Sequence, residues 1–133
     1  MYQHVSQYKK QEIQTASPGK LIVMLYDGAI RNLESAKSSF EEKDFEAGTE
    51  KRIKAQDIIL ELIGSLDFEK GGKIAKNLNI LYSYILSRLR DVDFKNDASG
   101  FDEAIKILSQ LREAWDKIVQ EQTASKKHYA RTG

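Results

Sequence analysis

The chain has 133 residues, a length that suits one folded domain. Hydrophobic residues make up 41% and charged residues 31%, a balance that supports a soluble globular core and excludes a disordered chain and a membrane protein. Because 21 Lys and Arg face 20 Asp and Glu, the formal charge of +1 supplies no basic field to bind nucleic acid.

The first 16 residues are interpreted as an N-terminal arm. They are rich in Gln, Lys and Tyr and lack the apolar run of about 7 to 15 residues that a signal peptide requires, so we expect a cytosolic protein. Tyr2, Val5 and Tyr8 recur at every third residue ahead of Ile13, which places them on one face. The segment is too short and polar to be stable alone, and we hypothesise that it docks on the domain as a detachable lid.

Ser17 and Pro18 predict the start of the first helix. The serine oxygen can cap free backbone N–H groups, and proline at the first helical position needs no donor. The residues that follow recur at steps of three or four and predict a helix with one face in a core. They are Ile22, Leu25, Ala29, Leu33, Ala36 and Phe40.

Asp44 predicts the start of a second helix that ends near Asp67. Its apolar residues cover a broad arc and indicate deep burial. One stripe holds Ala55, Ile59, Leu62 and Leu66, and Ile53, Leu60 and Ile63 widen it.

A break at Gly71-Gly72 precedes the third predicted helix, whose stripe is Ile74, Leu78, Leu81, Ile85, Leu89 and Val92. The fourth helix is predicted to start at Ser99 or at the nearby Asn96 or Asp97. Its stripe is Phe101, Ile105, Leu108, Leu111, Trp115 and Ile118.

The predicted connections at 41–43, 67–72 and 93–98 are short, so successive helices must turn back on each other. The sequence therefore predicts an all-α fold, an antiparallel up-down-up-down four-helix bundle over residues 17–122. Residues 123–133 carry no apolar periodicity and are predicted to be a flexible, disordered C-terminal tail.

Catalytic and metal chemistry find no support in the sequence. Cysteine is absent, and the two histidines, His4 and His128, lie in the predicted arm and tail, where no carboxylate-histidine motif or catalytic triad can form. Residues 91–97 resemble a calcium loop but carry Lys95 and Asn96 at unsuitable positions, and Gly71-Gly72-Lys73 lacks the rest of a phosphate loop. We interpret these two segments as a loop and a turn, and expect no enzyme, no metal and no cofactor.

Apolar residues exceed what one buried face needs. Residues 21–26 are apolar on every side, so Leu21 and Met24 point away from the predicted core face, and residues 58–60 repeat this feature. Ile80 and Tyr84 likewise lie off the main stripe of the third helix. Two explanations stay open: a wide core arc covered by the arm, or a groove for a partner's amphipathic helix.

The sequence also resembles a known family over nearly its whole length. The segments Thr15-Ala16-Ser17-Pro18 and Met24-Leu25-Tyr26-Asp27-Gly28-Ala29 are similar to the opening of the FliS family of flagellar secretion chaperones. Further segments are similar to the later helices of that family: Lys54-Ala55-Gln56, Ile58-Ile59, Glu61-Leu62, Leu66-Asp67, Asn77-Leu78, Leu81-Tyr82, Tyr84-Ile85, Arg88-Leu89 and Leu111-Arg112 with Ala114-Trp115. The chain departs from the pattern at Val92-Asp93, where the family often has Ala-Asn.

The resemblance implies a cytoplasmic export chaperone without enzymatic activity. Such a protein binds the disordered C-terminal segment of flagellin, prevents its premature polymerisation and supports its delivery to the flagellar type III export apparatus. The contact residues implied by the matching motifs are Tyr8, Leu21, Met24, Ile58, Asn77, Tyr82 and Tyr84. For Tyr82 a place in the core is nearly as well supported. Residues assigned to the core are Ala29, Ala55, Leu62, Leu78, Leu89, Leu111 and Trp115.

A second function from another class stays open. A helical adaptor that self-associates through the same apolar surface, without an export client, would show similar patterning. The sequence leaves undecided whether the free protein is a monomer or a weak homodimer and which flagellin it binds.

Overall fold

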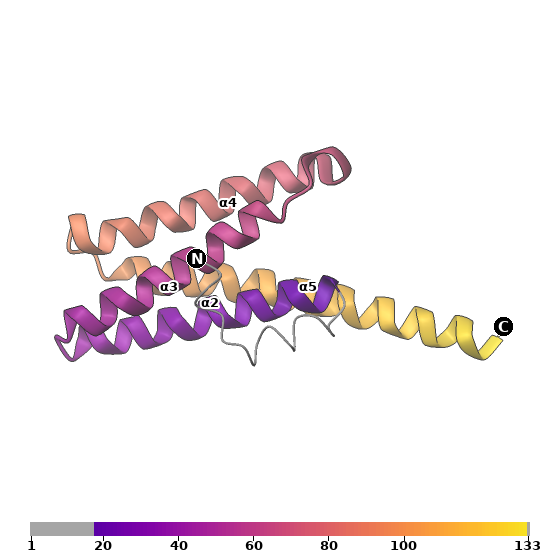
Figure 1. Cartoon of the computed structure of the whole chain (residues 1–133), viewed down its shortest axis with the longest axis horizontal. Coiled ribbons are helices and arrows are strands. Elements are labelled where there is room, and N and C mark those ends of the chain that lie inside the picture. Colours follow the sequence, from indigo (N-terminus) through magenta and orange to yellow (C-terminus); the bar gives the residue numbers. More distant parts are fainter. Residues whose placement is uncertain (1–17, 133) are drawn as a thin grey trace.

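The computed structural model describes residues 18–132, without the side chains of 94, 123 and 125–132. This part of the chain forms four helices and no strand. They are α2 (Pro18–Glu41), α3 (Phe45–Gly64), α4 (Phe68–Phe94) and α5 (Ser99–Thr132), as Figure 1 shows. Tyr8 and the rest of the predicted arm lie outside the described residues.

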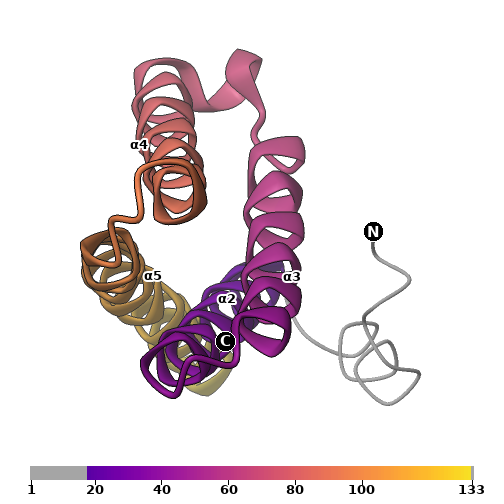
Figure 2. The ribbon, with the colours of Figure 1, turned by 90° about the vertical axis from the view of Figure 1, so that its left-hand side faces the viewer.

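The helices form the predicted antiparallel bundle. Helix α2 packs against α3 and α5, and α4 packs against the same two helices from the other side. Figure 2, seen along the bundle, shows α2 between α3 and α5 with α4 across from α2. Each helix therefore contacts both of its neighbours along the chain, as an up-down-up-down topology requires.

The start of α3 follows the sequence prediction, because the carboxylate of Asp44 accepts a hydrogen bond from the N–H of Ala47 at 3.3 Å. The next connection is shorter than predicted. Asp67 caps α4 by accepting bonds from the N–H groups of Glu69 and Lys70 at 3.1 and 3.0 Å. The predicted break is present at Gly72, where φ is 49° and ψ is −123°, but it lies inside α4 instead of preceding it.

The core follows the predicted stripes for most of their length. Ala29, Ala55, Leu62 and Leu89 are buried, while Leu78, Leu111 and Trp115 are partly buried and pack against them, which confirms the seven predicted core residues. Tyr26 and Tyr82 are among the largest buried side chains. The sequence had not assigned Tyr26 to the core, and for Tyr82 it had left the choice between core and binding site open.

Five residues of the predicted stripes are exposed instead. Ile74 is 71% exposed, and Leu81 in the same helix is exposed as well. The core face of α4 runs through Ala75, Leu78 and Tyr82, one position further along the helix, which turns Ile74 and Leu81 outward. The other three corrections are Ile53, Leu60 and Ile118.

Arg88 holds the connection between α4 and α5. Its guanidinium donates to Asp91 at 3.3 Å, to Asp97 at 3.1 Å and to Glu103 at 2.7 Å. Hydrogen bonds from Ser99 and Arg88 hold the pKa of Asp97 below its usual value. Two carboxylates of the calcium-like segment thus bind a guanidinium, in agreement with its interpretation as an interhelical loop.

Val92 and Asp93, where the sequence differs from the family's usual Ala-Asn pair, both have a structural role. Val92 is buried in the core, and Asp93 forms an ion pair with Arg52 of α3, which is only 7% exposed. Because a charge that far from water needs a counterion, Asp93 stabilises the contact between α3 and α4.

Helix α5 extends past the other three helices in Figure 1. Its helical backbone includes residues 123–132, for which the sequence shows no apolar periodicity, and the flexibility of this segment stays a prediction. Within residues 18–132, none of the helices combines the length and the apolar character that crossing a membrane requires.

Candidate binding groove

An apolar groove lies at the end of the bundle where α2 begins and the α3–α4 connection turns. It has a volume of about 530 Å³ and receives side chains from all four helices. Apolar residues and glycines dominate its lining: Pro18, Gly19, Leu21, Ile22, Leu25, Leu66, Gly71, Ile74, Ala75, Leu78 and Trp115. The polar lining residues are Glu61, Ser65, Asp67 and Tyr82.

The start of α2 lies close to α5 beside this groove. A Cβ atom on Gly19 would lie 2.7 Å from Cγ2 of Val119, so a larger residue at this position would require the Val119 side chain to shift. Next to it, α4 is turned by the break at Gly72, where a positive φ suits glycine. These two glycines set the positions of the groove's walls.

Tyr82, one of the lining residues, shares a hydrogen bond with the buried Tyr26. The hydroxyls of Tyr26 and Tyr82 form a hydrogen bond of 2.5 Å between α2 and α4. Burial raises the pKa of both phenols, and a hydrogen bond from Trp115 to Tyr26 opposes this rise only in part. Both phenols therefore stay neutral at physiological pH. The hydrogen bond between them holds α2 against α4 and adds no charge to the groove.

Two of the predicted contact residues lie in this groove. Leu21 lines it from α2, and Tyr82 lines it from α4 although the residue is only 2% exposed. Tyr82 thus belongs to the core and reaches the groove at the same time, so the two alternatives for this residue coexist.

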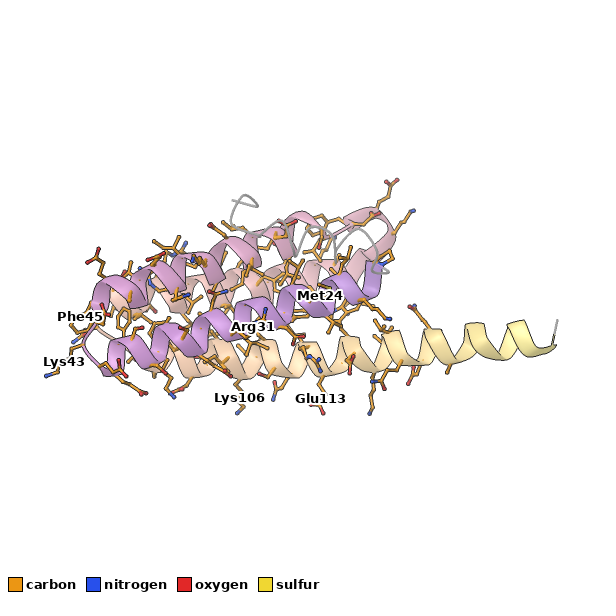
Figure 3. All side chains as sticks on the ribbon, turned by 60° about the horizontal axis from the view of Figure 1, so that its bottom comes forward. Met24, Arg31, Lys43, Phe45, Lys106 and Glu113 are labelled. Carbon is orange, nitrogen blue, oxygen red and sulfur yellow. The ribbon has the colours of Figure 1, made fainter. Side chains whose placement is uncertain are left out.

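Met24 and Ile58 do not line the groove. Met24 is half-buried, and Figure 3 shows it on α2, towards the opposite end of the bundle from Phe45. Ile58 packs against the core, where its Cδ1 atom would be 3.3 Å from a Cβ atom on Gly28. Ile58 therefore fills the contact between α2 and α3.

Asn77 and Tyr84 are exposed on α4, outside the groove lining. The hydroxyl of Tyr84 donates to Glu103 of α5, and this bond raises the pKa of Tyr84 above its usual value. Bonds from Tyr84 and Arg88 in turn hold the pKa of Glu103 below its usual value. The tyrosine is thereby fixed in place on the outer side of the α4–α5 contact.

Sequence reasoning did not name the other lining residues as site candidates, and three of them are Ile74, Leu66 and Glu61. Ile74 was assigned to the core. It follows the Gly71-Gly72 break directly and therefore lies at the end of the bundle, where fewer side chains are available to cover it. Leu66 was likewise assigned to the core. Glu61 appeared only within the Glu61-Leu62 segment that resembles the family, and it was given no role, because a glutamate on a helix is usually solvated.

Metal binding has no candidate in the described part of the chain, which contains no group of three or more side chains of the metal-ligating types His, Cys, Asp and Glu. What the groove offers is apolar surface with few polar groups. Such a surface suits an amphipathic peptide segment.

Comparison with known proteins assigns the chain to a family. The family described as flagellar protein FliS matches residues 1–122. The flagellar secretion chaperone FliS of Salmonella typhimurium is 43% identical over 107 residues, covering 80% of this chain and 79% of the relative. Those of Vibrio cholerae and Bacillus subtilis are 36% and 32% identical, covering 86% and 85% of this chain and 87% and 84% of the relatives. This four-helix chain belongs to the FliS family of flagellar proteins.

Proposed function

We propose that the protein is a non-enzymatic export chaperone of the cytoplasm whose client is flagellin. The apolar groove receives part of flagellin's C-terminal segment, which keeps this segment from polymerising early and allows delivery to the flagellar type III export apparatus. The observation that carries the proposal is the groove of about 530 Å³ lined from all four helices. Family membership supports the identity of the client, since relatives at 32 to 43% identity are named flagellar secretion chaperones.

Binding by this groove couples to folding of the client. A disordered segment that becomes helical on a surface loses conformational entropy, which costs about 2–5 kcal/mol of the interaction energy. Burial of apolar side chains against Leu21, Ile74 and Trp115 offsets this cost. The complex is then specific and still reversible, as a transport chaperone requires.

Four predicted contact residues lie outside the groove lining. Met24 and Ile58 lie on α2 and α3, and Asn77 and Tyr84 lie on α4. A client segment longer than the groove would reach some of them while wrapping around the bundle.

The N-terminal arm is proposed as a lid. It joins the bundle at Pro18, which is itself a lining residue, so the arm starts at the groove's edge. Its apolar face, with Tyr2, Val5, Tyr8 and Ile13, would cover the groove until the client displaces it.

A self-associating adaptor is the competing function. Exposed Ile80 on α4, together with Ile53 and Leu60 on α3, gives the protein apolar surface outside the groove that a second copy can bury. This reading predicts a stable dimer that ignores flagellin.

Calorimetry separates the two functions. The purified full-length protein is titrated with the C-terminal segment of flagellin from the same organism, and light scattering after size exclusion gives the mass of the complex. One-to-one binding with a large negative enthalpy and heat-capacity change supports the chaperone. A stable dimer with no heat of binding supports the adaptor and refutes the chaperone.

A further inference from the structure

One polar side chain of the groove lining has no partner within the described part of the chain. Ser65 donates its hydroxyl to the carbonyl of Leu62 at 2.7 Å, Asp67 caps α4, and Tyr82 bonds to Tyr26. Glu61 forms neither a hydrogen bond nor an ion pair with any described residue. Among the described residues, its carboxylate is therefore the charged group of the lining that has no intramolecular partner.

The surroundings of Glu61 favour a positive ligand. Burial raises the pKa of its carboxyl group, because the apolar wall removes water from the charged form. Among the described lining residues the charged ones are Glu61 and Asp67, and no Lys or Arg lines the groove. The groove is thus apolar with a negative side, and a bound cation would stabilise the desolvated carboxylate.

We propose that Glu61 determines which segment the groove accepts, by binding a positively charged hydrogen-bond donor that the client brings beside its apolar side chains. This inference rests on the proposed function. The donor is a Lys or Arg side chain of the client or the N–H groups at the start of a client helix, both of which carry positive charge towards a carboxylate. Apolar contacts supply most of the affinity, and Glu61 sets the register of the segment.

The position of Glu61 supports a role in register. It lies in the last turn of α3 and shares the groove lining with Pro18 and Leu21 of α2. A positive group can meet this single carboxylate in only one alignment of the client helix, and a shift by one residue would leave the carboxylate unpaired beside an apolar side chain.

The test compares Glu61→Gln with the unchanged protein in calorimetric titrations with the C-terminal segment of flagellin from the same organism. We expect the dissociation constant of Glu61→Gln to rise about tenfold, because a charge-assisted bond becomes a neutral one. Glu34→Gln, which removes one exposed carboxylate of α2 far from the groove, serves as the matched control and should change affinity less than about twofold. Circular dichroism checks that all three proteins are equally helical.

Client variants identify the source of the charge. Each Lys and Arg of the segment is replaced in turn by Gln and titrated against both proteins. If one replacement weakens binding to the unchanged protein but not to Glu61→Gln, that Lys or Arg side chain is the donor. If Glu61→Gln weakens the binding of every client variant by the same factor, the donor is the N-terminus of a client helix.

If Glu61→Gln binds the parent segment as tightly as the unchanged protein or more tightly, the proposal for Glu61 is wrong. The proposed chaperone function is not affected by that result. If the unchanged protein shows no binding, both the function and this inference fall. An equal loss for Glu34→Gln and Glu61→Gln also overturns it, since net charge and not the groove carboxylate would then set affinity.

Discussion

The hydroxyl groups of Tyr26 and Tyr82 join α2 to α4 through a hydrogen bond of 2.5 Å. The two rings lie 6.4 Å apart and are tilted by 48°, within the range in which aromatic pairs attract each other. Because α2 and α4 face each other across the bundle, this pair is a direct link between helices that otherwise meet through α3 and α5. Tyr82 also lines the groove, so this one side chain serves both stability and the binding surface.

Removing either hydroxyl should destabilise the fold. Tyr82→Phe leaves the Tyr26 hydroxyl without its partner on α4, and Tyr26→Phe does the reverse; we expect each to lower the free energy of unfolding by about 1–3 kcal/mol. The double variant should lose less than the sum of the two, because both hydroxyls of the shared bond are then gone. Urea denaturation measures all four proteins, and strictly additive losses would contradict a working bond between the hydroxyls.

Alkaline pH should weaken the fold through the same pair. Burial raises the pKa values of Tyr26 and Tyr82 above the ordinary value of 10.0, so the unfolded chain loses these protons first as pH rises. Their contribution is fully present below about pH 10 and is lost progressively above it. The free energy of unfolding, measured from pH 8 to 11, should therefore fall.

The Tyr26→Phe/Tyr82→Phe variant should fall less steeply over that range. Tyr84→Phe serves as the comparison, because this exposed phenol also has a raised pKa, owing to its bond with Glu103. If Tyr84→Phe flattened the profile and the double variant did not, the buried pair would not be the cause.

Ile74→Asp tests the groove with little effect on the fold. Ile74 lines the groove yet is 71% exposed, so a charge there costs little stability but opposes burial of an apolar client. We expect at least about tenfold weaker binding of the flagellin segment, the equivalent of about 1.4 kcal/mol. Calorimetry gives the affinity, and the midpoint of thermal unfolding should stay close to that of the unchanged protein.

Ile80→Asp is the matched control for this variant. It makes the same change in the same helix at a side chain that is 65% exposed and lies outside the groove lining. Because Ile80 lies between the proposed outer contact residues Asn77 and Tyr84, binding should weaken by less than it does in Ile74→Asp. A greater loss for Ile80→Asp than for Ile74→Asp would move the contact surface to the outer face of α4, near Tyr84.

Helix starts and most of the core were predictable because they depend on local rules. Pro18 and Asp44 gave recognisable start signals, and steps of three and four residues identified Ala29 and Leu89 as core. The Gly71-Gly72 break gave the start of α4 too late, because Asp67 already caps this helix. These features follow from backbone hydrogen bonding and from the helical period. They do not depend on which neighbouring helix is present.

The groove was less predictable because it depends on how helices are rotated and where they end. For α4 the apolar residues occupy two adjacent stripes, and periodicity alone does not tell whether Ile74 with Leu81 or Ala75 with Tyr82 faces inward. The bond to Tyr26 and the small size of Ala75 favour the second stripe. Glu61 became visible only through the apolar groups that surround it, which come from other helices.

Gly72 should be the most sensitive backbone position near the groove. Its φ of 49° with ψ of −123° is a conformation that residues with a Cβ atom rarely adopt, although no atom would touch an added methyl group. Gly72→Ala should therefore lower the free energy of unfolding by about 1–2 kcal/mol through backbone strain alone.

Gly64→Ala provides the contrast, because an added methyl group at this helical position also meets no atom and φ is not positive. We expect it to be neutral or to stabilise by up to about 1 kcal/mol, since alanine favours helix over glycine. Urea denaturation of both variants decides. Equal effects would mean that α4 straightens at no cost when Gly72 is replaced, and the turn that presents Ile74 and Ala75 to the groove would then not depend on this glycine.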